Sequence, residues 1–299
     1  MNNKINFSNY FNIANIFSLL AVLISILFLF FKGLNYGVDF KGGTLLEIRI
    51  ENTNIQIQDL RSSLNISDLG DVNVKKFGVE GDFLIKFEKN ANENEKFITE
   101  LKSIISKKID SAINFRRVES VGPKVSSELL KQGLTAIVLA LGAMLFYIWI
   151  RFEWQFSLGA IVALIHDIVI TLGIFSILSF EVNLSIVAAV LTIVGYSMND
   201  TVVIFDRIRE NLLKYSKIKT NEITDISVNE TLSRTIITSL TTLLALFSIF
   251  ILGGEVLKGF SFAMILGVII GTYSSIFVAS PVLNYFKVTQ KTLLKEDDI

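Results

Sequence analysis

Ionisable side chains interrupt three otherwise apolar stretches of this sequence, and they are the residues best suited to chemistry. His166 and Asp167 adjoin in one stretch, Asp200 lies in the next, and Arg234 opens a third. Such groups are costly in apolar surroundings and are functional by default. A carboxylate in a low-dielectric site holds a proton more readily, and a nearby guanidinium favours its release. If Arg234 approaches and leaves Asp200, the carboxyl group would release and take up a proton. An Asp–Arg pair that only packs two helices together is the alternative.

Other polar residues accompany these groups. His166 titrates near neutrality when unperturbed and could relay a proton. Alternatively, His166 and Asp167 together could form a purely structural contact between helices. The candidates for proton conduction are Asp200, Arg234 and Asn199. The supporting polar residues of the apolar stretches are His166, Asp167, Thr235, Thr238, Ser239 and Thr242. The hydroxyl groups in this set have a simpler alternative, because they often bond to carbonyls of their own helix or to neighbouring helices.

The elements that must position these groups are membrane-spanning helices. Hydrophobic residues make up 51% of the 299 residues, and the mean hydropathy of +0.55 is well above that of ordinary soluble domains. A bilayer core about 30 Å thick needs about 20 mostly apolar residues in a helix. Six stretches qualify, namely 13–31, 133–150, 157–180, 182–205, 235–252 and 260–283.

The orientation of these helices follows from the basic residues near their ends. The first stretch could be a signal peptide, but its apolar run is longer than usual and no small-residue cleavage pattern follows, which favours an uncleaved anchor. Lys4, Arg151, most basic residues of the loop between the fourth and fifth stretches, and those of the C-terminal tail fall on one side. Positive charge marks the cytoplasmic side, so both termini are expected there. Asp206 and Arg207 are interpreted as interfacial charges.

Helix counting places the charged groups at similar depths. With a rise of about 1.5 Å per residue, Asp200 lies about 25 Å, His166 about 21 Å and Arg234 about 27 Å from the outer ends of their helices. Arg234, Thr238 and Thr242 are four residues apart and share one helix face. Asp200 and Arg234 are therefore expected to meet across a helix interface.

The segment between the first two apolar stretches predicts a small extracytoplasmic α+β domain. Strand-like patterns fall at 44–51, 72–77, 82–88 and 113–121, with helical patterns at 57–64 and 93–109. The order β-α-β-β-α-β is that of the split-βαβ or ferredoxin-like arrangement. The predicted division is therefore an N-terminus and first helix (1–32), this domain (33–132), the five-helix remainder (133–286) and a cytoplasmic tail (287–299).

Composition excludes several classes of function. The sequence has no cysteine and a single histidine, which argues against disulfides and against cysteine- or histidine-rich metal sites. Its formal net charge is zero, which argues against a nucleic-acid-binding protein. The outward segment carries no nucleophile–base set and no phosphate-binding loop. We expect no enzymatic activity, no cofactor and no metal.

Four segments carry a resemblance to a known family. Residues 37–44 alone predict a turn in which glycines supply positive φ, but they also match the GxDFxGGT motif of the SecD/SecF family. The motif positions are Gly37, Asp39, Phe40, Gly42, Gly43 and Thr44. Residues 195–211 resemble the fourth-helix motif of the family, residues 232–239 and 271–277 resemble its fifth and sixth helices, and His166-Asp167 matches its third-helix pair. The resemblance runs from the first to the sixth helix.

The resemblance implies a fold and a function. SecD/SecF proteins belong to the proton-driven RND superfamily, and two six-helix halves, one of them SecD, form a twelve-helix unit in the bacterial inner membrane. They associate with the SecYEG channel and use the proton motive force to promote export of unfolded preproteins after SecA has acted on the cytoplasmic side. The resemblance implies that Asp200 and Arg234 conduct protons and that the motif at 37–44 acts as a hinge or neck. A proton-driven efflux component and a passive scaffold of a membrane complex are the alternatives.

Overall fold

The computed structural model describes residues 5–51, 57–64, 72–76, 80–87, 99, 102–103, 105–107, 113–215 and 218–293. The chain divides into two compact units. The helical unit comprises 1–35, 136–181 and 185–299, and the small unit comprises 36–135 together with 182–184. Each unit is described here by itself.

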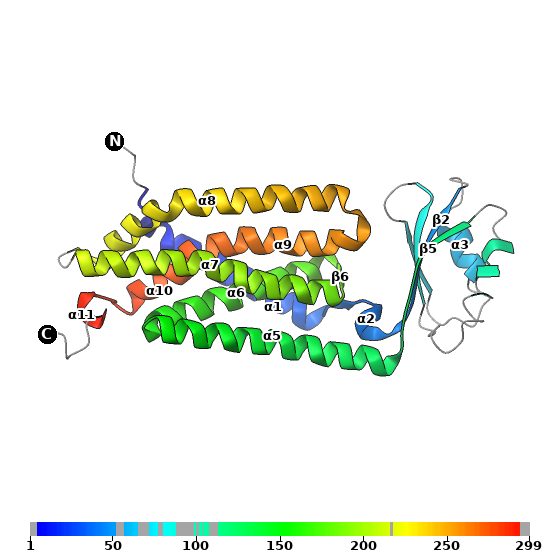
Figure 1. The fold of residues 1–299 in the computed structure, drawn as a ribbon, viewed down its shortest axis with the longest axis horizontal. Coiled ribbons are helices and arrows are strands. Elements are labelled where there is room, and N and C mark those ends of the chain that lie inside the picture. The colour runs from blue at the N-terminus through cyan, green and yellow to red at the C-terminus, as the bar shows by residue number, and fades with distance from the viewer. Residues whose placement is uncertain are drawn as a thin grey trace. The chain divides into compact units, whose positions relative to one another are not determined.

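The helical unit is built from long apolar helices. Its elements are a 3-10 turn η1 (Phe7–Tyr10), α1 (Phe11–Phe31), the greater part of α5 (Pro123–Arg151), α6 (Trp154–Leu178), α7 (Leu184–Lys214), α8 (Thr220–Leu252), α9 (Gly254–Ser274), a π-helical turn η3 (Ser275–Ala279), α10 (Ser280–Tyr285) and α11 (Gln290–Leu293). Within the described chain, six helices are long and apolar enough to cross a membrane. This confirms the six predicted spans. η1 and α11 lie at the same end of the helical unit (Figure 1).

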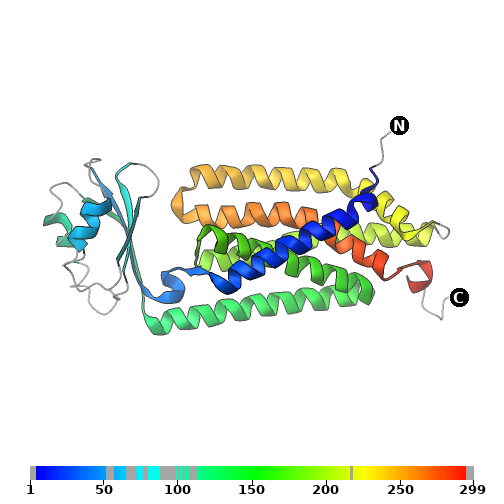
Figure 2. The same ribbon diagram turned by 180° about the vertical axis from the view of Figure 1, so that it is seen from behind.

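Three helices form the interior of this unit. Half or more of the residues in the apolar windows of α6, α7 and the α9–α10 helix are buried, against less than a fifth of those in α1, α5 and α8. Aromatic rings close the interior near one end, where Phe156 packs edge-on against Phe205 with ring centroids 5.2 Å apart. α1 runs diagonally across neighbouring helices on the face seen in Figure 2. The mostly exposed apolar sides of α1, α5 and α8 are what helices facing lipid or another membrane protein require.

Two helices extend well beyond the predicted apolar stretches. α8 begins at Thr220 rather than near 235, and α7 continues to Lys214 rather than ending near 205. The added segments are polar, so hydropathy alone does not detect them. They are amphipathic, and Ile223 and Val228 of α8 bury one side in the same core as Ile208 of α7. Packing of that apolar side keeps the segments helical outside the predicted membrane core.

The small unit contains a four-stranded antiparallel sheet with strand order β3-β4-β2-β5. Its elements are α2 (Val38–Lys41), β2 (Gly43–Ile50), α3 (Ile57–Leu64), β3 (Val72–Lys76), β4 (Asp82–Phe87) and β5 (Ile113–Val121). A further two-stranded pair joins β1 (Asn35–Tyr36) to β6 (Glu181–Val182). The helical pattern predicted at 93–109 lies largely outside the described residues, although Ile105 is helical and fully buried.

One face of this sheet makes the core of the small unit. Leu46, Ile48 and Ile50 alternate along β2 and are at most 1% exposed, and they pack with Leu60 of α3 and Ile85 of β4. This alternation is the period of two expected of a strand with one buried face. The alternation of apolar residues along β2 therefore decides which of its side chains face the core.

Candidate functional site

The polar centre of the helical unit is Asp167 on α6, whose side chain is fully buried. Its Oδ2 accepts hydrogen bonds from the hydroxyl of Ser197 on α7 at 2.6 Å and from that of Ser274 on α9 at 2.8 Å. Its Oδ1 lies 2.8 Å from Nδ1 of the neighbouring His166. Both carboxylate oxygens are therefore occupied, and one side chain ties three helices together.

Asp200 on α7 has a different environment. Its side chain is 4% exposed, yet its Oδ2 has no hydrogen-bond partner among the described residues. The groups that act on the carboxyl electrostatically are the Thr272 hydroxyl on α9 and the Arg234 guanidinium on α8. A buried carboxyl oxygen without a partner is costly for the ionised form. The site is therefore chemically suited to hold a proton.

A chain of hydroxyl groups links the helices around Asp200. The hydroxyl of Ser239 on α8 lies 2.8 Å from that of Thr272, and Tyr196 on α7 donates to Ser239 at 3.4 Å. Thr235, one turn earlier on α8, is 1% exposed, and its hydroxyl has no partner in the described part of the chain. Groups that both donate and accept hydrogen bonds are what a proton path through a membrane protein needs.

Arg234 and Asn199 differ from Asp200 in exposure. Both are exposed, and no ion pair joins the described side chains of Arg234 and Asp200. Arg234 lies among exposed apolar residues such as Ile237 and Leu240 on the same helix. The structure thus places Arg234 within electrostatic reach of Asp200 but leaves its side chain available to a neighbouring surface.

The remaining predicted hydroxyl groups of α8 bond within their own helix. Thr238 donates to the Arg234 carbonyl at 3.0 Å, and Thr242 donates to the Thr238 carbonyl at 2.8 Å. This is the ordinary behaviour of threonine inside a helix. Among the predicted supporting residues, only His166, Asp167, Thr235 and Ser239 therefore point to neighbouring helices or into the interior.

Sequence reasoning missed four residues of this site: Tyr196, Ser197, Thr272 and Ser274. Serine and threonine are common in membrane helices, so their type alone does not single them out. A spacing signal was available for Ser197, which lies three residues before Asp200 and therefore on nearly the same face of α7. Only the packing of α9 against α6 and α7 identifies Thr272 and Ser274.

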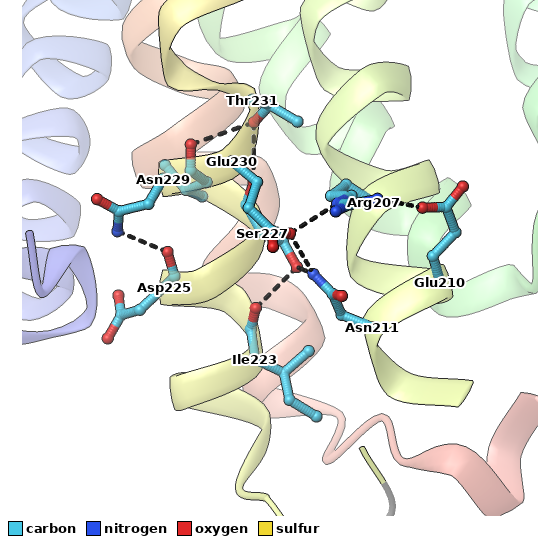
Figure 3. Close-up of polar contacts among 10 residues, drawn as sticks. Arg207, Glu210, Asn211, Ile223, Asp225, Ser227, Asn229, Glu230 and Thr231 are labelled. Carbon is cyan, nitrogen blue, oxygen red and sulfur yellow. Dashed lines mark hydrogen bonds and ion pairs between the residues drawn. The ribbon is translucent and has the colours of Figure 1, made fainter. Parts of the chain in front are cut away.

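The polar extensions of α7 and α8 form a second network (Figure 3). Arg207 donates from Nε to Glu230 and from Nη1 to Glu210, each at 2.6 Å. Asn211 donates to Ser227 at 2.9 Å and to Glu230 at 2.8 Å. Arg207 and Glu230 are more than a third exposed, so this network fixes the helix ends and does not form a buried catalytic centre.

Nearby charges at the same end are paired as well. Arg151 donates to the exposed Asp206 at 2.6 Å, and the Asp225 carboxylate accepts from the backbone and hydroxyl of Ser8 at 2.8 and 2.6 Å. The latter contact attaches η1 to the start of α8. Asp206 and Arg207 thus occupy exposed positions with salt-bridge partners at the helix ends.

The motif at 37–44 forms a compact junction within the small unit. Gly42 and Gly43 have φ values of +78° and +110°, which L side chains rarely adopt. A Cβ on Gly42 would lie 3.3 Å from the Val121 carbonyl oxygen. The Asp39 carboxylate accepts a hydrogen bond at 2.9 Å from the backbone N–H of Leu184, the first residue of α7. The motif therefore turns the chain into β2 and caps the helix that carries Asp200.

The other motif positions secure this junction. Phe40 is buried and packs edge-on against Tyr36, with ring centroids 6.1 Å apart. The buried hydroxyl of Thr44 lies 2.9 Å from that of Ser120 on β5. Gly37 donates its N–H to the Val182 carbonyl at 2.9 Å. The side chains of Phe40 and Thr44 thus make contacts that other residue types would lose, whereas the Gly37 contact is made by the backbone.

Comparison with known proteins identifies the family. The profile of "Protein export membrane protein SecD/SecF, C-terminal" matches residues 101–289, and that of the "SecD/SecF GG Motif" matches residues 27–53. "Protein translocase subunit SecF" of Rickettsia bellii is 43% identical over 287 residues, which cover 95% of this chain and 94% of that protein. The protein of the same description from Cereibacter sphaeroides is 44% identical over 266 residues, which cover 86% of this chain and 81% of that protein.

A solved structure agrees with this assignment. The crystal structure of SecDF from Thermus thermophilus, described as a translocon-associated membrane protein, matches 96% of this chain with a TM-score of 0.87 and 35% identity. The chain spans 39% of the length of that SecDF chain. A second SecDF structure, in a super-membrane-facing form, matches with a TM-score of 0.71 and 33% identity. The chain therefore belongs to the SecD/SecF family of protein-export membrane proteins.

Proposed function

We propose that this chain works with SecD as a proton-driven auxiliary subunit of the Sec translocase, in which Asp200 carries the proton. The observation that carries the proposal is the buried, unpaired carboxyl oxygen of Asp200, which contrasts with the fully bonded Asp167. Two buried aspartates with such different surroundings divide naturally into a working group and a structural one. The family assignment supplies protein export as the process.

The proposed cycle involves Asp200, Arg234 and the hydroxyl groups between α8 and α9. Asp200 takes up a proton while Arg234 is distant, because an ionised carboxylate without a partner is costly in this site. When Arg234 approaches, it stabilises the carboxylate and the proton leaves. The hydroxyl groups of Ser239 and Thr272 offer a route to Asp200, and the exposed Asn199 is proposed to assist on the adjoining surface. One charge crossing 100 mV releases about 2.3 kcal/mol, enough to bias two conformations.

The motif at 37–44 is proposed to transmit this change to the outward domain, residues 33–132. Asp39 caps the first residue of α7, the helix that carries Asp200, and Gly42 and Gly43 supply the backbone freedom of a hinge. The strand order β3-β4-β2-β5 favours a ferredoxin-like domain whose second helix falls at 93–109. Such a domain would act on exported chains as a binding or mechanical module.

The proposed setting is the bacterial inner membrane with both termini in the cytoplasm. The basic residues near the ends of α5, α7 and α8 support this orientation. SecYEG, SecA and unfolded preproteins are the proposed partners beyond SecD. The exposed face of α8 around Arg234 is suited to meet the SecD half, because it combines a cation without an ion-pair partner among the described residues with exposed apolar side chains.

Pulse-chase export of a secreted protein tests the proposal. Cells depleted of their own SecF would receive this chain with its SecD, either unchanged or as Asp200→Asn. We expect Asp200→Asn to abolish the stimulation of export while the chain still co-purifies with SecD. Asp206→Asn is the matched control, since Asp206 lies on the same helix in an exposed salt bridge, and it should export normally. Normal export by Asp200→Asn at equal membrane level would instead support a passive scaffold.

A further inference from the structure

An apolar cavity of about 490 Å³, open at the surface of the helical unit, lies between α1, α6 and α9. Ile170, Ile174 and Ile177 line it along α6, and the rings of His166 and Tyr273 lie at one end. From His166 to Ile177 the helix rises by about 16 Å. The volume falls within the range of about 300–1,000 Å³ typical of small-molecule sites. The cavity is therefore long, lined almost entirely by apolar side chains and large enough for an organic molecule.

His166 supplies a polar group to this apolar space. Its side chain is 5% exposed, and its Nε2 has no hydrogen-bond partner among the described residues. Its Nδ1 lies 2.8 Å from Asp167 Oδ1, while the Ser197 and Ser274 hydroxyls donate to the other oxygen of the same carboxylate. A carboxylate can only accept hydrogen bonds, so a neutral imidazole at this position carries its proton on Nδ1. In this neutral form Nε2 is an acceptor, and a buried acceptor requires a donor.

Two simple occupants, a water molecule and an inorganic cation, do not suit the site. A buried water needs two to four polar partners, and the nearby Tyr273 hydroxyl is already engaged with the Ala14 carbonyl at 2.9 Å and the Ser18 hydroxyl at 3.0 Å. An inorganic cation is disfavoured because the lining is almost entirely apolar. The hydrocarbon chain of a phospholipid would fill the space but carries no donor for Nε2.

We propose that this cavity binds a single-chain amphiphile whose head group donates a hydrogen bond to His166 Nε2 and whose hydrocarbon chain lies between α1, α6 and α9. The head is a hydroxyl or an un-ionised carboxyl group. A carboxylate has no donor for the Nε2 lone pair, so the ionised form does not fit. This site does not depend on the proposed role of Asp200.

Two matched ligands test the hydrogen bond. The full chain, purified in detergent and stripped of lipid, is titrated with 1-decanol or with decyl methyl ether, which keeps the oxygen and the chain but lacks the donor. The dissociation constants come from ligand-induced shifts of the melting temperature. We expect 1-decanol to bind about three- to tenfold more tightly, the range expected of one neutral hydrogen bond. Equal binding of the two compounds would overturn the proposed pairing with His166.

Three variants locate the site. His166→Phe keeps a ring against Tyr273 but removes Nε2, so it should lower decanol affinity to that of the ether. Ile174→Trp fills the cavity and should weaken both ligands. Ile165→Trp is the control, because Ile165 lies on the same helix, is 52% exposed and does not line the cavity. Unchanged binding in Ile174→Trp would overturn the location.

Competition with phospholipid distinguishes a single-chain ligand from the hydrocarbon tail of a bilayer lipid. Unlabelled phospholipid is added to the decanol complex of the unchanged protein and of His166→Phe. The proposal expects phospholipid to displace 1-decanol from the unchanged protein poorly. Complete displacement at low phospholipid concentration, with equal strength in both proteins, would mean that the cavity seats a bilayer lipid tail, and it would overturn the proposed head-group recognition.

Discussion

Asp167 and Asp200 lie on neighbouring helices of the same unit, and both are almost completely buried, but their surroundings are opposite. Asp167 has two serine hydroxyls and a histidine nitrogen within 2.8 Å. Asp200 has one oxygen without any partner in the described structure. A carboxylate with full hydrogen bonding resists protonation and movement, whereas a poorly bonded one changes state at lower cost. The difference indicates that hydrogen bonding, more than burial, separates a structural aspartate from a candidate proton carrier.

The same difference explains the role of the serines on α7 and α9. Ser197 and Ser274 bond to Asp167 and leave Asp200 to Thr272 and Arg234. Small residues bring the helices close enough for these contacts, since a Cβ on Gly271 would lie 3.0 Å from the Ser197 side chain. Close helix approach and hydroxyl bonding thus act together, as is common in membrane helix pairs.

The largest expected effect is the difference between substitutions at the two aspartates in how far they destabilise the folded chain. Asp167→Ala leaves His166, Ser197 and Ser274 without their shared acceptor, and we expect it to destabilise the chain by about 3 kcal/mol or more. Asp200→Ala removes an oxygen that has no partner, so the melting temperature should stay the same or rise. Thermal unfolding of the purified full chain measures both. Equal destabilisation by the two changes would erase the distinction between them.

Arg234 provides a functional test of the same contrast. Arg234→Gln removes an exposed cation, so its effect on stability should lie within about 0.5 kcal/mol. Export in the pulse-chase assay should nevertheless fall nearly as far as in Asp200→Asn, because proton release from Asp200 then lacks its trigger. Arg151→Gln removes another exposed arginine at the helix ends and should leave export unchanged. Comparable export by the two glutamine variants would remove Arg234 from the mechanism.

Asp82 of the small unit is a third buried carboxylate, and we expect a smaller effect on stability from its titration. Arg49 donates two hydrogen bonds to it at 2.6 and 2.7 Å and holds the pKa of Asp82 below its usual value. Because the folded-state pKa is depressed, the stabilisation is fully present above the unfolded pKa of about 3.9 and is lost as the pH falls through the folded value.

Hydrogen exchange of β2 and β4 in the full chain measures this loss. Between pH 5 and pH 2, after correction for intrinsic exchange rates, protection should decline in the unchanged protein. Asp82→Asn should start with lower protection and show a flatter pH profile. Glu119→Gln, which alters a half-exposed pair with Arg117 on the same sheet, is the control and should retain the decline. A steep decline in Asp82→Asn would assign the pH dependence to another group.

The sequence alone determined the six helices, the strands of the small unit and the charged residues inside apolar stretches. These features depend on local composition and periodicity, because a bilayer requires long apolar runs and a half-buried strand requires alternation. The sequence also selected His166, Asp167, Asp200 and Arg234, since ionisable residues stand out in apolar helices. It did not predict the polar end of α7 or the polar start of α8, whose helical state depends on their packing against each other.

Only the tertiary structure decided how these residues divide their roles. Asp167 and Asp200 look equivalent in the sequence, and their difference arises from hydroxyl groups that α7 and α9 bring from 30 and 107 residues away. The partner of Asp39 likewise lies 145 residues along the chain. Hydrogen bonds depend on distances of a few ångströms and on direction, and helix packing sets those quantities where sequence spacing does not. For this reason the sequence named the candidate groups, and the fold assigned their surroundings.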